Sequence, residues 1–531
     1  MESTRTEAAP LAPSADGRGL PSSARSHTAW PFHLESLVRR SLALLILLLL
    51  AASASALSAQ IAQSEFAARR SALAAALPDG VILVLGAGEP NPDFNPFHQH
   101  PQFRYLTGFD EPGSALVIVK AGESRRELLF VRPRDPAAEV WNGARLGVDG
   151  ARTALGMEGR NAAVLRMVID SLLSQYKTLH VLGDIGARMT ERSVHDQFVD
   201  AVALANPNVT IDSHTASRAI SLLRGKKSTA ELDRIRISSE ISARGHVAAM
   251  RLVQPGIAEF ELQAAAEGVW RREGADGPSY GSIVGSGPNA TTLHYNRNDR
   301  TAAAGELIVM DMAAYFDGYA ADITRTVPVS GRFNTEQRAI YQLVLDAHKA
   351  AERQIRVGGP ARAMTDSANA VLAAGLTAVG LIESPAATYD CGSADQPRSC
   401  PQLSLYYMHG LGHGIGLLVH DPDQYSATGK FAVGSAFTIE PGIYVRGNLL
   451  EIIADTPRNR EVRAKIGVAA ARHANIGVRI EDDYLVTSSG VIRPSEGAPR
   501  EIADIEKLLA EPRTARDASV VERYRKFKTG R

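Results

Sequence analysis

Residues 307–326 read LIVMDMAAYFDGYAADITRT, two apolar runs on either side of an Asp-Gly turn signal. This pattern predicts a β-hairpin. If residues 315–318 form a four-residue loop, Asp311 lies opposite Asp322 with the two Cβ atoms about 5 Å apart. Two facing carboxylates repel each other, and a cation between them removes the repulsion. The alternative is that one aspartate belongs to the turn and the other pairs with Arg325.

Histidines cluster further along the chain, around the segment MHGLGHGIG of residues 408–416. His409 and His413 lie in this segment and His420 follows it, so three of the 14 histidines fall within twelve positions. The glycines let the backbone approach a site closely. A lone histidine is usually a core or surface residue, whereas this density indicates a site. The spacing is not H-E-x-x-H, because Gly410 stands where the glutamate would be needed.

Two glutamates lie at the ends of apolar, strand-like runs. Glu440 closes the run 436–439 and is followed by a proline, which cannot continue a central strand. Glu481 follows the run 477–480, and Arg479 lies two positions before it on the same face. Charged residues in such runs are seldom buried without a partner. Four carboxylates and one imidazole make an oxygen and nitrogen ligand set that suits Mn²⁺, Co²⁺, Fe²⁺ or Zn²⁺.

Taken in order, these residues resemble the pita-bread metallopeptidases. Among them the chain looks like the Xaa-Pro aminopeptidases (aminopeptidase P), with the prolidases as nearest relatives. The motifs HGLGH, TIEPG and RIEDD carry the resemblance, and FRYLTGFDEP at residues 103–112 is similar to the family's N-terminal domain. The resemblance implies α/β and α+β architecture, with an N-terminal α/β creatinase/prolidase-like domain followed by a C-terminal pita-bread metallopeptidase domain.

The resemblance also implies a role for each site residue. Asp322 and Glu481 would bridge two divalent ions, most consistent with Mn²⁺, with Co²⁺ or Zn²⁺ as alternatives. Asp311 would hold one ion, and His413 with Glu440 the other. Glu440 would also carry a proton to the leaving nitrogen. The remaining candidates are three histidines around the substrate and an arginine that braces the carboxylates: His294, His409, His420 and Arg479.

Patterning divides the 531 residues into a leader, two domains and a tail. Residues 61–223 alternate strand-like and helical runs, which predicts an α/β domain. A capping box at Ser228 and Glu231 opens the catalytic domain, residues 226–497, and residues 498–531 form a helical, basic tail. The predicted strands are 81–85, 114–120, 127–133, 178–183, 307–314, 321–329, 436–440 and 478–487, and the predicted helices are 162–175, 228–252, 258–273, 335–357 and 363–380.

The leader, residues 1–59, predicts a disordered start followed by a signal peptide. Two arginines precede an apolar run at residues 42–52 and an Ala-Ser-Ala site, which is the order of a secretory signal. We expect cleavage after Ala56 or Ala59 and export to the periplasm or the medium. The alternative is an uncleaved segment that anchors the protein to a membrane.

The only two cysteines, Cys391 and Cys400, flank a polar loop. In an oxidising compartment such a pair closes a short loop, so export favours a disulfide here. Segment 386–405, which contains the pair, and segment 448–476 are longer than the resemblance leads us to expect. These insertions leave the preferred length of the substrate open.

Composition limits the partners. Lys plus Arg and Asp plus Glu both number 58, so the net charge gives no reason to expect nucleic acid. An apolar share of 45% is that of a soluble globular protein. The resemblance implies proline-containing peptides as substrates and a homo-oligomer.

The predicted function is removal of the N-terminal residue from peptides with proline in the second position. A prolidase, which cuts only Xaa-Pro dipeptides, stays open as an alternative. A methionine aminopeptidase is disfavoured by the large N-terminal domain and by export. A catalytically silent binding protein would have no need for all five ligands.

Overall fold

The computed structural model describes residues 60–89, 97–186, 191–393, 395–396, 398–512, 519–520, 522–523 and 526. The predicted leader and signal peptide, residues 1–59, lie outside these residues, as do residues 513–518, 521, 524–525 and 527–531 of the predicted tail. Gln60 begins one compact unit. Among the described residues, none of the helices has the length and apolar character needed to cross a membrane.

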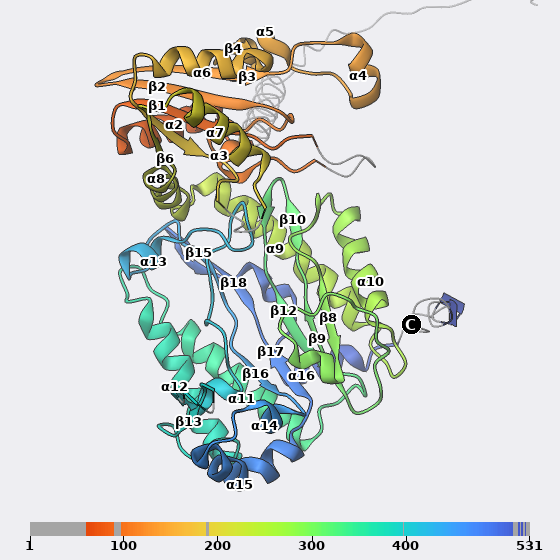
Figure 1. Cartoon of the computed structure of the whole chain (residues 1–531). Coiled ribbons are helices and arrows are strands. Elements are labelled where there is room, and N and C mark those ends of the chain that lie inside the picture. The colour runs from red at the N-terminus through yellow and green to blue at the C-terminus, as the bar shows by residue number, and fades with distance from the viewer. Residues whose placement is uncertain are drawn as a thin grey trace, which may run out of the picture. The chain divides into compact units, whose positions relative to one another are not determined.

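A six-stranded sheet organises the N-terminal part, in the order β4-β3-β2-β1-β5-β6 (Figure 1). Its strand β1 (Gly80–Leu85) pairs antiparallel with β2 (Ala115–Ala121) and parallel with β5 (Thr178–Leu182). All six residues of β1 are buried, as expected for a strand covered on both faces. The outer strands are β3 (Ser124–Val131), β4 (Glu158–Asn161) and β6 (Thr210–Asp212).

Helices cover both faces of this sheet. One apolar cluster joins it to α6 (Leu165–Leu173) and α7 (Val194–Ala205). A second joins it to α2 (Gln63–Ala76), α3 (Pro101–Thr107) and α8 (His214–Gly225). Two further helices, α4 (Pro136–Asn142) and α5 (Gly147–Leu155), lie between β3 and β4 in the chain.

The predicted elements of this part are largely confirmed. Strands occupy the predicted runs 81–85, 114–120 and 178–183 to within a residue or so at each end. The predicted helix 162–175 is a 3-10 turn, Ala162–Val164, that continues into α6. The short strands β4 and β6 were not predicted.

The C-terminal part begins with α9 (Thr229–Met250), and its predicted capping box is confirmed. The Glu231 backbone N–H donates to the Ser228 hydroxyl at 3.3 Å, and the Ser228 N–H donates to the Glu231 carboxylate at 3.0 Å. A capping box satisfies two N–H groups that have no partner within the helix. Asn334 and Gln337 form a second capping box, at the start of α11 (Thr335–Glu352).

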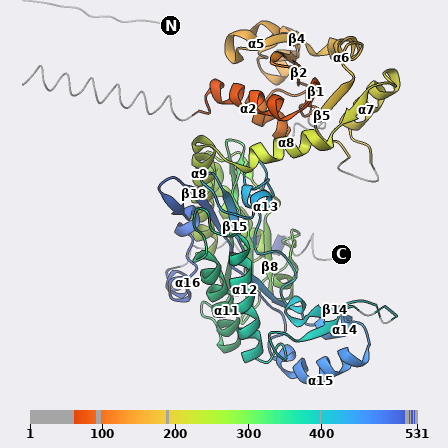
Figure 2. The ribbon, with the colours of Figure 1, turned by 90° about the vertical axis from the view of Figure 1, so that its left-hand side faces the viewer.

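Small antiparallel sheets and two helix pairs build this part. Helix α9 packs on α10 (Glu259–Arg272), and α11 lies beside α12 (Arg362–Ala378) in both views (Figures 1 and 2). Side chains of these four helices and of the strands share one apolar core, to which α16 (Ile502–Leu509) also contributes. The principal strands are β8 (Ile283–Ser286), β9 (Leu307–Asp311), β10 (Ala314–Phe316), β11 (Tyr319–Ala320), β12 (Thr324–Pro328), β15 (Ala436–Ile439), β16 (Gly442–Val445), β17 (Ile476–Arg479) and β18 (Asp482–Thr487).

The register predicted for the hairpin of residues 307–326 is wrong. Asp311 lies opposite Thr324, and Tyr315 opposite Ala320, so Asp311 does not face Asp322 directly. The loop has two residues, Asp317 and Gly318, both with positive φ, as a tight hairpin turn requires. The observed partner of Asp311 lies two residues further along the chain than the predicted one. Because side chains alternate between the two faces with period two, Asp311 and Asp322 still share a face.

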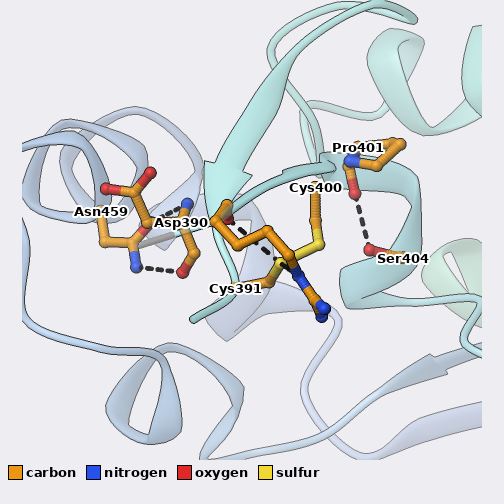
Figure 3. The surroundings of a disulfide bond; sticks show 7 residues. Asp390, Cys391, Cys400, Pro401, Ser404 and Asn459 are labelled. Atoms are coloured by element: carbon orange, nitrogen blue, oxygen red, sulfur yellow. Dashed lines mark hydrogen bonds between the residues drawn. A yellow bond between two sulfur atoms is a disulfide. The ribbon is translucent and has the colours of Figure 1, made fainter. Parts of the chain in front are cut away.

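The two long insertions pack against each other. The first is the hairpin β13 (Thr388–Asp390) and β14 (Ser399–Pro401), and the second carries α14 (Leu449–Ile452) and α15 (Pro457–Arg472). Figure 3 shows the Asn459 side chain bonded to the backbone of Asp390, with 2.9 Å to its N–H and 2.8 Å to its carbonyl. The predicted disulfide between Cys391 and Cys400 is formed next to this contact.

A substitution at Gly245 of α9 tests how closely α9 and α10 approach each other. A methyl group there would lie 2.1 Å from Nε1 of the buried Trp270. We expect Gly245→Ala to lower the free energy of unfolding by about 1–3 kcal/mol, as overpacking does. The control is Gly268→Ala in α10, where the nearest atom is 3.6 Å away. That change should raise the stability by up to about 1 kcal/mol, because alanine favours a helix more than glycine does. Urea unfolding of the two variants measures both effects, and equal stabilities would refute this packing.

Candidate metal centre

The two hairpin aspartates come together around one tyrosine. Asp311 ends β9 and Asp322 lies between β11 and β12, and both side chains are buried. The Tyr280 hydroxyl lies 2.6 Å from a carboxylate oxygen of each. One hydroxyl carries one proton and donates to only one of the two carboxylates, so the other receives no hydrogen bond from Tyr280. Burial and these carboxylates raise the pKa of Tyr280 well above its usual value.

Glu481 and His413 approach Asp322 from two other segments. Glu481 follows β17, and its backbone N–H donates to the Thr324 carbonyl at 3.0 Å. Nε2 of His413 lies 3.4 Å from Asp322 Oδ2 and 3.6 Å from Glu440 Oε1. Asp322, His413 and Glu481 offer one ligand atom each within 4.8 Å of one another. That spacing fits a metal ion held by oxygen and nitrogen.

Arg479 is the cation that the protein itself supplies to this cluster. Its buried guanidinium forms an ion pair with Asp311. It also donates to the Thr324 hydroxyl at 3.0 Å and to the Tyr444 hydroxyl at 2.9 Å. The Arg479 side chain is therefore held by three partners, which keep its guanidinium beside Asp311.

The alternative partner for an aspartate, Arg325, is wrong. Its guanidinium binds Asp482 at 2.6 Å, and both side chains are fully buried. A second donor of Arg325 reaches the backbone carbonyl of Glu481 at 2.6 Å. Arg325 thus fixes the backbone that carries Glu481, and its carboxylate partner is Asp482 rather than a hairpin aspartate.

A cavity of about 260 Å³ brings all the predicted site residues together. It is lined by Leu293, His294, Asp311, Asp322, His409, His413, His420, Glu440, Arg479 and Glu481. Sequence reasoning did not single out Tyr280, Thr324 and Tyr444, whose hydroxyls bind these residues. Their only signal is proximity in the fold, which a single sequence does not reveal.

A hydrogen-bond chain fixes His409. Arg479 donates to the Tyr444 hydroxyl, which lies 2.9 Å from Nε2 of His409. Nδ1 of the same ring lies 2.8 Å from the Gly410 carbonyl, so Nδ1 carries the proton and Nε2 accepts. Burial and the charge of Arg479 lower the pKa of His409 to about 4. The ring is neutral at physiological pH.

The loop that carries His413 and His420 is tied to the segment between the two domains. The two rings lie 4.3 Å apart between centroids. Asp421, the next residue, forms buried ion pairs with Arg224 and with Lys227, the latter at 3.0 Å. At Gly416 an added Cβ would lie 2.4 Å from the Asp421 carboxylate, so the loop closes tightly only around glycine.

The cavity lining contains more carboxylates than cationic side chains. Burial and the neighbouring carboxylates raise the pKa of Glu481 well above its usual value. Burial also raises the pKa of Glu440 to about 7, against the opposing effects of His413 and Arg479. Burial alone would lower the pKa of His413, but the hydrogen bond to Asp322 and the charges of Asp322 and Glu440 raise it to about 9. Three buried carboxylates and the half-buried Glu440 therefore share one arginine, and divalent cations would balance the remaining negative charge.

Two family models match the chain. Metallopeptidase family M24 matches residues 233–488, and the aminopeptidase P N-terminal domain matches residues 66–181. The Xaa-Pro aminopeptidase of Haemophilus influenzae is 34% identical over 464 residues, 85% of this chain and 98% of that protein. The Xaa-Pro aminopeptidase of Escherichia coli is 31% identical over 473 residues, 86% and 99% of the two chains.

Solved structures agree with these matches. Aminopeptidase PepP of Pseudomonas aeruginosa superposes with a TM-score of 0.71 at 32% identity, over 85% of this chain and 98% of that one. Proline aminopeptidase P II of Yersinia pestis gives a TM-score of 0.71 at 29% identity, over 85% and 100%. A further similar structure is described as zinc-substituted Escherichia coli aminopeptidase P in complex with product.

Metal binding should release protons. At pH 7 the raised pKa of His413, about 9, places a proton on this ring in the metal-free protein, and a bound ion displaces it. Affinity for Mn²⁺ should therefore rise with pH and level off above about pH 9, where most of the protein has lost the His413 proton. Titration calorimetry in buffers of different ionisation enthalpy measures the release. His413→Ala should release fewer protons and the control His214→Ala as many as the wild type, whereas heats independent of the buffer would contradict this charge balance.

Proposed function

The chain belongs to metallopeptidase family M24, and we propose that the five clustered ligand residues hold two divalent ions at which it cleaves Xaa-Pro peptides. It is a metal-dependent aminopeptidase that removes the N-terminal residue from peptides with proline in the second position. Its two domains are the N-terminal domain of aminopeptidase P and a pita-bread catalytic domain. The observation that carries this function is the buried cluster of ligands in a chain that matches Xaa-Pro aminopeptidases over 85% of its length.

The ligands divide between the two ions as follows. Asp322 and Glu481 would contribute to both, Asp311 would hold one, and His413 with Glu440 would hold the other. The convergence of Asp322, His413 and Glu481 within 4.8 Å supports a shared ion at these three residues. When bound, two such ions lower the pKa of water and polarise the scissile carbonyl. We propose Mn²⁺ as the physiological metal because oxygen ligands predominate, with Co²⁺ and Zn²⁺ as alternatives.

The side chains around the ions handle the proton and the substrate. Glu440 takes the proton of the attacking water and delivers it to the proline nitrogen as the carbon–nitrogen bond breaks. His294 and His420, which line the same cavity, donate hydrogen bonds to the substrate and to the negative charge that develops on its carbonyl oxygen. His409 belongs to this shell of histidines, and its chain of bonds to Tyr444 keeps it oriented. Arg479 holds Asp311 in position.

Activity on a tripeptide tests this function. Metal-stripped protein should gain the ability to release arginine from Arg-Pro-Pro when Mn²⁺ is added, and Co²⁺ and Zn²⁺ rank the alternatives. His413→Ala and Glu481→Ala should each lower kcat/KM by about 10³-fold or more while the protein stays folded. His214→Ala, an exposed histidine of α8, is the matched control and should behave as wild type. Cleavage of Gly-Pro alone would identify a prolidase, and cleavage of neither peptide would favour a binding protein.

We propose that the chain is exported and that its leader is removed. The support is the order of basic, apolar and small residues before Gln60 and the disulfide between Cys391 and Cys400, since disulfides persist in oxidising compartments. Expressed in full in a bacterial host, the protein should be recovered outside the cytoplasm with its N-terminus at Leu57 or Gln60, as N-terminal sequencing would read. An intact leader in the membrane fraction would instead establish an anchor. Assembly into a homo-oligomer stays a prediction.

A further inference from the structure

Residues 286–300 form a loop that carries His294 into the catalytic cavity. The loop leaves the end of β8 at Ser286 and returns at Arg300, beside a bridge between Ala258 and Thr301. Its two ends are close, because the Arg300 guanidinium donates to the Ser286 hydroxyl at 2.8 Å, as in the compact surface loops that often carry function. His294 itself is largely exposed and lines the cavity, so its position depends on what holds the loop.

One buried carboxylate, Glu259, binds both ends of this loop. Its Oε1 accepts from the Ser286 backbone N–H and hydroxyl, both at 2.7 Å. Its Oε2 accepts from the Arg300 backbone N–H at 2.8 Å and lies 2.8 Å from the Tyr295 hydroxyl. Tyr295 is the residue after His294. A single side chain thus contacts the beginning of the loop, its end and the neighbour of the histidine.

The charge of Glu259 suits this task. Within the described residues it has no ion pair, and the Arg300 guanidinium binds Glu306 at 2.6 Å instead. Glu259 is the first residue of α10, where the helix dipole stabilises a negative charge. It is fully buried, so its oxygens have no water to accept from and depend on the donors of the loop.

We propose that Glu259 is a positioning residue for catalysis, which acts by holding the loop so that His294 reaches the substrate. This assignment rests on the proposed role of His294 in the peptidase reaction. The carboxylate is essential because one of its oxygens accepts from the beginning of the loop, at Ser286, and the other from its end, at Arg300. In a glutamine the amide nitrogen replaces one oxygen, and whichever way the amide points, the Ser286 or the Arg300 N–H loses its acceptor.

The test is a double-mutant cycle between Glu259→Gln and His294→Ala, read on Arg-Pro-Pro with Mn²⁺. Alone, Glu259→Gln should lower kcat/KM by about 10–100-fold, as the loss of a residue that orients a catalytic group does. In the His294→Ala background the same change should cost less than about twofold, because the group that Glu259 positions is gone. Glu261→Gln is the matched control, since it makes the same change of charge in the same helical turn, and should be close to wild type.

In the activity measurements, the proposal is overturned by unchanged activity of Glu259→Gln or by an equal loss in both backgrounds, which marks a merely structural residue. If Glu259→Gln does not fold, Tyr295→Phe removes one hydroxyl donor of the same network, and its smaller loss should also vanish in the His294→Ala background. Hydrogen exchange of residues 286–300 gives a readout independent of activity, and it should quicken in Glu259→Gln but not in Glu261→Gln. A wild type inactive on Arg-Pro-Pro would refute the proposed function, whereas unchanged exchange in the loop would refute only the role of Glu259.

Discussion

Four carboxylates that line one cavity form the constraint on which the rest of the structure depends. Asp311, Asp322, Glu440 and Glu481 come from different segments, and the protein supplies them with Arg479 as the only buried guanidinium of the cavity lining that is described. Without further positive charge their mutual repulsion would push the segments apart or keep protons on the carboxylates. Divalent ions therefore complete the packing of the centre as well as its chemistry.

Behind these ligands, a layer of buried polar side chains fixes the backbone. Arg325 and Asp482 pair beneath Glu481, and Asp483 accepts from the Asp322 N–H. His246 of α9 lies 2.9 Å from the Met312 carbonyl and 3.1 Å from that of Ile323, the residues that follow the two hairpin aspartates. Each contact restrains the main chain next to a ligand. These contacts with neighbouring elements thus fix the geometry of the centre, which does not depend on the ions alone.

The carboxylates that converge in the cavity could be predicted because they interrupt apolar runs, where an unpartnered charge would be costly. The hairpin was predicted at the right place, but its register was wrong, since the sequence does not say whether Asp-Gly closes a two-residue or a four-residue loop. The side chains behind the centre escaped notice for another reason. Glu259 and Asp421 look like ordinary helix-end or loop acids, and their partners lie far away in the sequence.

The carboxylates and the histidines of the centre lie on two kinds of backbone, strands and loops. The carboxylates of the cavity lie on or next to strands, whose ladders hold the backbone and so preserve the distances between these side chains. Three histidines of the same lining lie on loops, and each loop is fixed by a buried polar group: Glu259 for His294, Tyr444 for His409 and Asp421 for His420. A loop held at one polar contact can change its length or sequence elsewhere without moving the ions. The loops around the cavity can therefore vary in sequence while the strands keep its carboxylates in place.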